Sequence, residues 1–333
     1  MKFLDLADLA ADRRERILSL AQELERFPLR DSLKGKTVGL LFMNPSLRTL
    51  ASMEAGITQL GGHSFVIAPG QNSWKLETKV GAVMDGDAVE HIREAIPVLA
   101  QYADALGVRC FAEGKDLQAD LQDGLIRAMA ELCPKPFVNL ESALSHPCQA
   151  LADWKTLEDL SVPRQGGKFV LSWAFHPKPL PYAVPASALN LAALRGMEVS
   201  ILRPDGFSLP TEVMERAHAL AQASGGSIEE TSDRARAMRG AHVLYVKSWA
   251  APQAYGRPAE EAKLREPLRA EWCVRESWFA TARPDAKAMH CLPVRRNVKI
   301  ADEVLDGPRS VVVRQAGNRL HVQKALLVEL LGG

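Results

Sequence analysis

Three short clusters of polar residues carry side chains that could bind anions. The first, Asn44-Pro45-Ser46-Leu47-Arg48-Thr49, lies between an apolar run and an amphipathic stretch. If Ser46 caps the helix that follows, the backbone N–H groups of the first turn form an anion site, and Arg48 adds a fork for phosphate or carboxylate oxygens. An ordinary serine N-cap beside a solvated arginine explains the same residues. The cluster is neither a Walker loop nor a GxGxxG fingerprint, so it does not indicate a nucleotide.

The other two clusters also follow predicted strands. Ser145-His146-Pro147-Cys148-Gln149 contains a His-Pro step, which restricts the backbone and could aim the imidazole at a ligand. A helix-start turn with a capping histidine fits equally well. In the third cluster, His290-Cys291-Leu292-Pro293-Val294-Arg295-Arg296-Asn297, the residue types suit the ligand-binding crevice at the carboxyl ends of parallel strands. A basic surface loop with a buried cysteine is the alternative.

Strands and helices must alternate to place these clusters. Several apolar runs are continuous rather than alternating, as in parallel strands that are covered on both faces. The predicted strands span residues 37–43, 63–68, 103–109, 136–141, 168–173, 198–203, 242–247, 286–292 and 310–314. The predicted helices span residues 5–25, 46–60, 88–102, 117–132, 148–160, 183–194, 211–224 and 317–331.

This alternation predicts an α/β protein with two doubly wound parallel-sheet domains. We expect the first domain to span residues 1–147, with a C-terminal helix at 317–333 returning to it, and the second to span 148–316. Residues 248–267 lack periodicity and are predicted to form a long loop that moves over a site.

Composition excludes several classes of protein. The 333 residues carry 41 Lys and Arg against 40 Asp and Glu, a formal charge of +1, whereas a nucleic-acid-binding protein normally has a basic face. No apolar run approaches the roughly 20 residues that span a bilayer. The five cysteines form no CxxC pair, which argues against a zinc ribbon or a disulfide framework. The start lacks the features of a signal peptide, so we expect a cytoplasmic protein that binds neither nucleic acid nor membrane.

Taken together, the three clusters resemble the carbamoyltransferase family, which includes the aspartate and ornithine enzymes. That family has a Ser-Thr-Arg-Thr phosphate loop after its first strand, a His-Pro-x-Gln element at the hinge and a late His-Cys-Leu-Pro element. Here the residues are SLRT at 46–49, HPCQ at 146–149 and HCLP at 290–293, in the same order and spacing. Three ordered motifs spread over most of the chain make coincidence a poor explanation.

Other segments resemble the smaller branch of the family that carbamoylates N-acetyl- or N-succinylornithine. The Asp-x-x-x-Ser-Met-Gly loop with which ordinary ornithine enzymes bind the free α-amino acid is not found in the sequence. An acylated substrate has no α-ammonium group, so the loss of that loop makes physical sense. The segments similar to the branch are Trp74-Lys75-Leu76-Glu77, Met84-Asp85-Gly86-Asp87, Phe175-His176-Pro177-Lys178-Pro179-Leu180, Lys247-Ser248-Trp249 and Arg295-Arg296-Asn297.

The resemblance implies a role for each matching residue. The implied carbamoyl-phosphate ligands are Ser46, Leu47, Arg48, Thr49, Trp74, Arg109, His146, Gln149, Cys291, Leu292 and Arg319. Within this set, the implied catalytic residues are Arg109, His146, Gln149 and Cys291. The implied N-acylornithine ligands are Val89, Glu141, His176, Lys247 and Leu292. Leu47 departs from the family's threonine, but its backbone N–H suffices for the contact, and the resemblance implies neither a metal nor a cofactor.

Two residues bear on the acyl group. Members that use acetyl substrates have a glutamate at the position of Val89, which would repel the distal carboxylate of a succinyl group by about 1–4 kcal/mol at short range. Val89 therefore favours a succinyl substrate. Lys299 matches a lysine that is carboxylated in acetyl-type members, although a plain surface lysine explains it as well. The two indications disagree, and we give Val89 more weight because its effect is direct.

The resemblance thus implies an N-acyl-L-ornithine carbamoyltransferase of arginine biosynthesis, with carbamoyl phosphate and N-acylornithine as substrates. It also implies a homotrimer in which Trp74 reaches the neighbouring subunit's site, although Trp74 as a core or rim aromatic is the alternative. The rival functions are a carbamoyltransferase for free ornithine or another amine, and a catalytically silent paralogue that binds phosphate or a partner protein.

Overall fold

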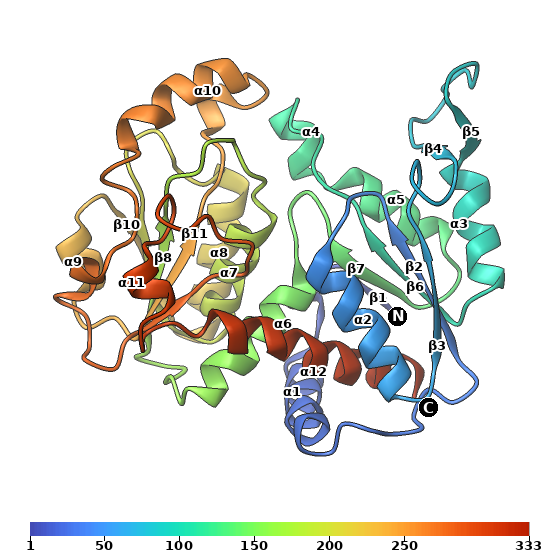
Figure 1. The fold of residues 1–333 in the computed structure, drawn as a ribbon, viewed down its shortest axis with the longest axis horizontal. Coiled ribbons are helices and arrows are strands. Elements are labelled where there is room, and N and C mark those ends of the chain that lie inside the picture. Colours follow the sequence, from blue (N-terminus) through green and yellow to red (C-terminus); the bar gives the residue numbers. More distant parts are fainter. Residues whose placement is uncertain (333) are drawn as a thin grey trace. The chain divides into compact units, whose positions relative to one another are not determined.

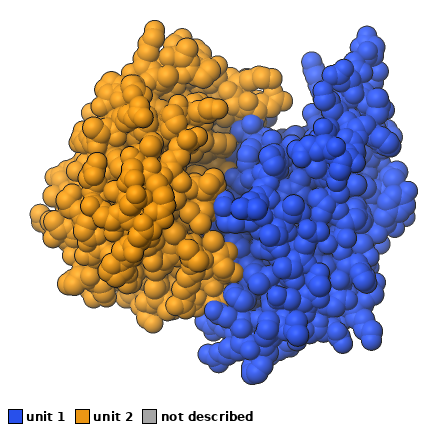
Figure 2. All heavy atoms as spheres, in the orientation of Figure 1, with its two compact units in different colours: residues 1–112, 122–151, 319–333 blue, residues 113–121, 152–318 orange. Residues whose placement is uncertain are grey.

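The computed structural model describes residues 1–332, and contacts among residues divide the chain into two compact units (Figure 2). Unit 1 contains residues 1–112, 122–151 and the chain from 319 onward, whereas unit 2 contains 113–121 and 152–318. The division falls within helices α6 (Pro147–Asp159) and α12 (Val312–Leu331). It lies four residues beyond the predicted boundary at 147–148, and it assigns 113–121 to unit 2. The end of the predicted helix 317–333, Gly333, lies outside the described residues.

Unit 1 is built on a five-stranded parallel sheet (Figure 1). Its order is β1 (Lys2–Phe3), β7 (Phe137–Glu141), β6 (Ala105–Arg109), β2 (Thr37–Phe42) and β3 (His63–Ile67). Its complete helices are α1 (Ala11–Arg26), α2 (Leu47–Gln59), α3 (Ile92–Gln101) and α5 (Gly124–Leu132). The central strands β2 and β6 are buried almost throughout, which explains their continuous apolar sequences.

Unit 2 repeats this architecture with a second five-stranded parallel sheet. Its order is β10 (Ser227–Thr231), β9 (Glu198–Leu202), β8 (Lys168–Trp173), β11 (Val243–Lys247) and β12 (Lys287–Met289). Its complete α-helices are α4 (Leu117–Leu121), α7 (Ala183–Leu194), α8 (Thr211–Ser224), α9 (Arg234–Met238), α10 (Pro258–Arg265) and α11 (Asp302–Leu305). The prediction of two parallel-sheet α/β domains is therefore confirmed.

Some predicted elements are wrong. Residues 310–314 form no strand, because α12 begins at Val312 and its packing overrides the β-branched sequence. Residues 248–267 are not one long loop but contain two 3-10 turns and α10. A buried ion pair between Glu261 and Arg265, both 1% exposed, anchors α10. Such an anchor argues against free movement of this segment.

Short strands escaped the prediction because they lack an apolar run. The predicted helix 88–102 starts as β5 (Ala88–His91), which pairs in parallel with β4 (Lys75–Glu77) to form a separate two-stranded sheet in unit 1. Strand β10 lies at a sheet edge and is only partly buried, so its sequence is polar. Among residues 1–332, no helix is long and apolar enough to cross a membrane.

Candidate active site

The first cluster lies where β2 leads into α2 in unit 1. Ser46 is the N-cap of α2, and its hydroxyl accepts a hydrogen bond from the Thr49 backbone N–H at 3.2 Å. The Leu47 side chain is 81% exposed, so this residue can contribute to a site in the unit only through its backbone. The Thr49 side chain is buried. The cap leaves the N-terminal N–H groups of α2 at the carboxyl edge of the sheet, where anions bind.

Arg319 on α12 contacts residues from two separate parts of unit 1. Its guanidinium donates to Thr49 Oγ1 at 2.9 Å and to Gln149 Oε1 at 3.1 Å, and it lies 3.4 Å from His146 Nε2. The side chain is 2% exposed. Burial lowers the pKa of Arg319 from its usual value, and Glu141, Arg109 and Arg48 all lie within electrostatic reach. The structure thus brings together four of the predicted carbamoyl-phosphate ligands.

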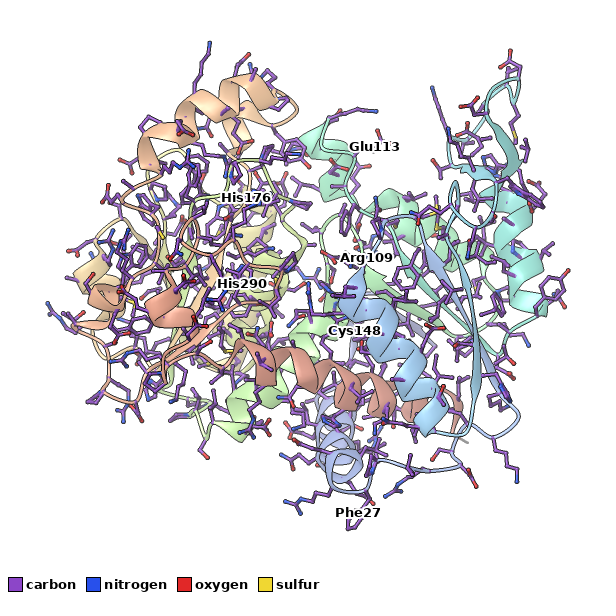
Figure 3. All side chains as sticks on the ribbon, viewed as in Figure 1. Phe27, Arg109, Glu113, Cys148, His176 and His290 are labelled. Carbon is purple, nitrogen blue, oxygen red and sulfur yellow. The ribbon has the colours of Figure 1, made fainter. Side chains whose placement is uncertain are left out.

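A second contact set adjoins this one at the ends of β6 and β7. Arg109 forms an ion pair with Glu141, and Glu141 Oε2 lies 3.4 Å from His146 Nε2. A register shift between Val108 and Arg109 pairs Arg109 with Glu141 across the two strands. Figure 3 labels Arg109 at this edge. Glu141, predicted to bind the acylornithine, therefore contacts two residues predicted to bind carbamoyl phosphate.

Buried hydrogen bonds hold the turn that precedes His146. The Ser142 hydroxyl donates to Asp123 Oδ2 at 2.6 Å, and the Ser145 hydroxyl donates to Asp5 Oδ2 at 2.8 Å. Asp5 and Asp123 could not be predicted as supporting residues, because their partners are distant along the chain. Cys148 is fully buried, and burial raises the pKa of its thiol to about 11, so it stays a neutral packing residue.

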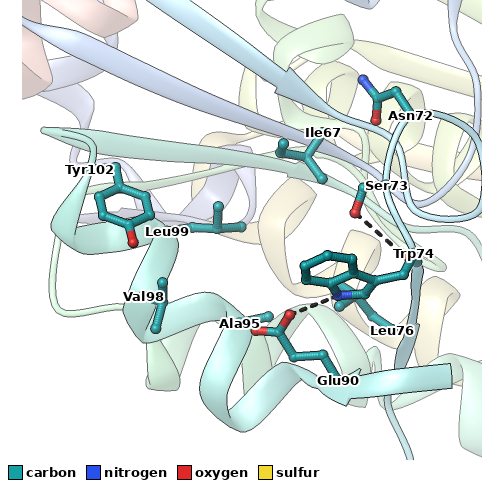
Figure 4. A pocket seen from close by; sticks show the side chains of 10 residues that line it. All are labelled: Ile67, Asn72, Ser73, Trp74, Leu76, Glu90, Ala95, Val98, Leu99 and Tyr102. Atoms are coloured by element: carbon teal, nitrogen blue, oxygen red, sulfur yellow. Dashed lines mark hydrogen bonds between the residues drawn. The ribbon is translucent and has the colours of Figure 1, made fainter.

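Trp74 and Val89 lie on the small sheet of β4 and β5. The Trp74 indole is 57% exposed and donates to Glu90 Oε2 at 2.7 Å, beside a cavity of about 470 Å³ (Figure 4). Ala95, Val98 and Tyr102 line the same cavity from α3 and its end, together with Ile67, Asn72, Ser73, Leu76 and Leu99. Val89 is 67% exposed. Trp74 is therefore a surface residue and not a core aromatic.

In unit 2, three predicted acylornithine ligands, His176, Lys247 and Leu292, follow neighbouring strands together with the predicted catalytic residue Cys291. His176 comes after β8, Lys247 ends β11, and Cys291 and Leu292 come after β12. These strands are adjacent and parallel, so their carboxyl ends lie at one edge of the sheet. Leu292 has a φ of 54°, a left-handed conformation that is uncommon for leucine. Leu292 is half-buried and Cys291 is 7% exposed.

Hydrogen bonds fix the tautomer of His176. Arg295 Nε donates to His176 Nε2 at 3.1 Å, so that ring nitrogen carries no proton. The other nitrogen, Nδ1, carries the proton of the neutral ring and donates to the Lys178 carbonyl at 2.8 Å, although the Lys178 backbone N–H also lies 3.1 Å from it. Burial, with Lys299, Arg295 and Lys247 nearby, lowers the pKa of His176 from 6.5 to about 4. The imidazole is therefore neutral at physiological pH.

Lys299 is not the surface lysine that was the alternative, because its side chain is 1% exposed. Burial lowers its pKa well below 10.5, and the positive charges of Lys247, Arg265 and Arg295 add to the effect. Lys247, Arg265 and Arg295, beside the buried Lys299 and the neutral His176, form a cationic edge in unit 2. Arg265 was not predicted as a site residue, and Arg295 was predicted only as part of the third cluster, without a role of its own. In residues 1–332, no group of His, Cys, Asp or Glu side chains has the arrangement of a metal site.

The chain matches one protein family along almost its whole length. Residues 1–159 match the carbamoyl-P binding domain of aspartate/ornithine carbamoyltransferases, and residues 183–330 match their Asp/Orn binding domain. The chain belongs to the aspartate/ornithine carbamoyltransferase family. The first match contains the Arg319 partners Thr49, His146 and Gln149, and the second contains Arg319 itself.

Relatives of this carbamoyltransferase include enzymes for two acylated ornithines. It is 40% identical to N-acetylornithine carbamoyltransferase of Xanthomonas campestris pv. campestris, covering 99% of this chain and 97% of the relative. It is 34% identical to N-succinylornithine carbamoyltransferase of Bacteroides thetaiotaomicron, covering 93% and 92%. A crystal structure of acetylornithine transcarbamylase complexed with acetylcitrulline superimposes with a TM-score of 0.96, at 40% identity and full coverage of both chains.

The carbamoyltransferase should lose stability in acid partly through His176. Since its pKa falls from 6.5 to about 4 on folding, the unfolded chain takes up a proton that the folded chain does not. The stability that this histidine provides is therefore complete above pH 6.5 and declines as the pH falls toward 4. Urea unfolding gives the free energy of unfolding at about pH 7 and at about pH 5. Between these pH values, this free energy should fall less for His176→Gln than for the wild type.

The matched control is His218→Gln, which changes an exposed histidine on α8. The free energy of unfolding of this variant should fall between about pH 7 and about pH 5 by the same amount as that of the wild type. An equal decline in His176→Gln and the wild type would show that the folded protein does not keep His176 neutral.

Proposed function

We propose that this carbamoyltransferase transfers the carbamoyl group of carbamoyl phosphate to the δ-amine of an N-acylated L-ornithine, forming N-acyl-L-citrulline and phosphate in arginine biosynthesis. The observation that carries the proposal is the buried Arg319 with its contacts to Thr49, His146 and Gln149. The cytoplasm is the proposed location, and the five described cysteines, all unpaired, suit a reducing compartment.

Excess positive charge supports carbamoyl phosphate as the ligand of unit 1. Arg48, Arg109 and Glu141 all lie within electrostatic reach of Arg319, so three arginines meet one carboxylate here. Buried charge requires compensation, and a phosphate beside the N-terminus of α2 would supply it. The planar guanidinium groups match phosphate oxygens in bidentate geometry, which an ammonium group cannot do.

The proposed reaction is direct attack on the carbamoyl carbon. The δ-amine, as free base, forms the new C–N bond, the C–O bond to phosphate breaks, and phosphate leaves with that electron pair. The nitrogen proton passes to phosphate or solvent. Arg109, His146 and Thr49 are the proposed donors to the oxyanion of the tetrahedral intermediate. Positioning the two substrates supplies much of the remaining rate enhancement.

The cationic edge of unit 2 is the proposed site of the acylornithine. Lys247 and Arg295 provide positive charge for the substrate's carboxylates. The neutral His176 accepts a hydrogen bond from Arg295, so its role is to orient that arginine and contact the substrate, not to carry a proton. Cys291 and Leu292 are the proposed contacts beside the reacting carbon.

We favour N-succinylornithine over N-acetylornithine as the substrate. Val89 brings no negative charge toward the distal carboxylate of a succinyl group. Acetylornithine transcarbamylase variants with one glutamate replaced by alanine, serine, proline or valine have been crystallised with carbamyl phosphate and N-succinyl-L-norvaline. We propose that Val89 occupies the position of that glutamate.

N-acetylornithine is the second candidate, and Lys299 favours it. An amine must be neutral to react with carbon dioxide, and burial with neighbouring cations favours the neutral form of Lys299. A carboxylated Lys299 would carry a negative charge at the acylornithine site. That charge would repel the distal carboxylate of a succinyl group. The greater identity to an N-acetylornithine enzyme, 40% against 34%, agrees with this candidate.

One assay separates these functions. The purified enzyme is incubated with carbamoyl phosphate and either N-succinyl-, N-acetyl- or free ornithine, and the ureido product is measured. Turnover with the succinyl compound alone supports the favoured substrate, and turnover with the acetyl compound alone supports the second candidate. Turnover with free ornithine alone contradicts the proposal. Carbamoyl-phosphate binding by calorimetry without any turnover indicates a silent paralogue.

The proposed assembly is a homotrimer in which Trp74 completes the site of a neighbouring copy. Seven of the thirteen exposed large apolar side chains among the described residues lie in the segment from Trp74 to Tyr102. They are Trp74, Val80, Val83, Met84, Val89, Val98 and Tyr102. An exposed apolar concentration of this kind marks a protein interface. The cavity beside Trp74 offers a place for side chains of the second copy.

Mixing two inactive variants should restore activity if sites are shared. Trp74→Ala removes the side chain that each subunit is proposed to contribute to the neighbouring subunit's site. Arg319→Ala removes a side chain that each subunit is proposed to contribute to its own site. In mixed trimers, some sites combine an intact Arg319 with an intact Trp74, so partial activity should return after unfolding and refolding the two together. Light scattering gives the assembly state. A monomer with full activity, or no recovery on mixing, would contradict the shared site.

A further inference from the structure

A chain of buried hydrogen bonds in unit 2 leads from α6 to the loop after β12. Gln315 on α12 is fully buried, and its amide nitrogen donates to Asp153 Oδ1 on α6 at 2.6 Å. Its amide oxygen accepts from the backbone N–H of His290 at 2.8 Å. Because one end of the amide donates and the other accepts, these partners fix its orientation. Figure 3 labels His290.

The same chain continues through the His290 side chain. His290 Nδ1 accepts a hydrogen bond from the backbone N–H of Leu292 at 2.8 Å. Cys291 lies between the two residues that are held in this way. Leu292 has a φ of 54°, and a leucine keeps this unfavourable conformation only where its surroundings determine it. The hydrogen bond to His290 supplies part of that constraint.

Asp153 anchors this chain of hydrogen bonds at its α6 end. Its Oδ2 accepts the Tyr245 hydroxyl at 2.9 Å, so donors from β11 and α12 hold both carboxylate oxygens. Asp153 is 1% exposed and Tyr245 is fully buried. Burial and the neighbouring Asp153 raise the pKa of Tyr245, so the phenol remains a donor. Satisfied buried networks of this kind make a local structure rigid.

We propose that Gln315 is a positioning residue for the transfer reaction, because it fixes the backbone of His290 and thereby orients Cys291 and Leu292. The inference rests on the proposed function, in which Cys291 and Leu292 contact the reacting groups. The hydrogen bonds of the Gln315 side chain to Asp153 and to the His290 backbone do not include Cys291 or Leu292. It acts through His290, which links the amide to the backbone of Leu292.

Asn318 offers a matched control on the same helix. It is 2% exposed, and its amide nitrogen donates to Thr156 Oγ1 and Asp159 Oδ2, both at 2.9 Å. Like Gln315, it is a buried amide that links α12 to an aspartate of α6. Its hydrogen bonds do not include the loop of residues 290–292. Replacing either amide with alanine should therefore weaken the packing of α12. Only the replacement of Gln315 should also change the orientation of the loop of residues 290–292.

The first experiment compares Gln315→Ala with Asn318→Ala. We expect Gln315→Ala to lower kcat/KM for the N-acylornithine by about tenfold or more, because a buried N–H loses its acceptor. Iodoacetamide should also alkylate Cys291 about tenfold faster, as measured by mass spectrometry of the Cys291 peptide. Asn318→Ala should change both quantities less than about twofold.

The second experiment uses Gln315→Glu, which keeps the acceptor for His290 but places a carboxyl group against Asp153. Two carboxylates at this distance hold a shared proton with a raised pKa. The facing groups are Asp153, Tyr245 and the His290 backbone. Relative to the wild type, this variant should therefore regain activity as the pH is lowered. That recovery decides the question even where Gln315→Ala fails to fold.

Three results would overturn the inference. They are equal kinetic losses in Gln315→Ala and Asn318→Ala, unchanged alkylation of Cys291 in Gln315→Ala, and a Gln315→Glu variant whose activity follows the pH profile of the wild type. Failure of the proposed function appears differently, as a wild-type enzyme without turnover of any acylated ornithine. In that case, the alkylation rates still test whether Gln315 orients Cys291.

Discussion

Replacing Arg319 with alanine is expected to lower kcat/KM for carbamoyl phosphate by about three orders of magnitude. The guanidinium donates to Thr49 and Gln149 and lies beside His146, all in buried surroundings. Under the proposed function, its loss removes charged hydrogen bonds to carbamoyl phosphate, and it also removes the buried hydrogen bonds to Thr49 and Gln149. Steady-state kinetics and calorimetric titration with carbamoyl phosphate measure the two effects.

Two further variants separate charge, geometry and folding at this position. Arg319→Lys keeps the charge, but an ammonium group cannot reach Thr49 and Gln149 as one planar guanidinium does. Its kcat/KM should therefore lie between those of Arg319→Ala and the wild type. Gln323→Leu changes a buried amide one turn later on α12, which bonds to Ser52 and not to the Arg319 partners. It should retain near wild-type kinetics. Equal losses in Arg319→Ala and Gln323→Leu would assign Arg319 a structural role.

Replacing Val89 with glutamate should reverse the preference for the acyl group. A carboxylate there repels the distal carboxylate of a succinyl substrate by about 1–4 kcal/mol, a loss of roughly 5- to 1000-fold in kcat/KM. N-acetylornithine has no distal carboxylate, so its turnover should change far less. The ratio of the two kcat/KM values is the quantity to measure.

Val83→Glu is the matched control for this experiment. Val83 is 82% exposed and precedes Val89 in the same unit, so the variant adds the same charge to a similar surface. Val89→Thr keeps the branched shape without charge. Both variants should keep the substrate preference of the wild type. If Val89→Glu lowers kcat/KM equally for both substrates, then Val89 does not face the acyl group. Lys299 then becomes the better indication of the substrate.

The central strands could be predicted from sequence because both of their faces are buried. Strands β2, β8 and β11 are continuous apolar runs, and each was predicted to within a residue or so. The edge strand β10 and the small sheet of β4 and β5 were missed, because a partly exposed strand needs no such run. Tertiary packing made residues 312–314 helical against their local preference.

The site was predictable only where its residues fall into short motifs. Residues 46–49 and 146–149 stand out from their neighbours, whereas Arg319 was assigned only through the resemblance to a family. Gln315 and Asp153 are 162 positions apart, and only the fold makes them partners. The same holds for Asp123, whose contact with Ser142 supports the turn before His146.

The discontinuity of unit 1 has a consequence for biosynthesis. Ribosomes make residues 1–112 and 122–151 of unit 1 early, but residues from 319 onward only after unit 2. A nascent chain therefore holds an unfinished unit 1 while residues 152–318 of unit 2 are translated. Lys324, fully buried, donates to the Leu24 and Pro28 carbonyls, so the end of the chain also completes the packing of α1. The unit that is started first is finished last, and it acquires the buried Arg319 only then.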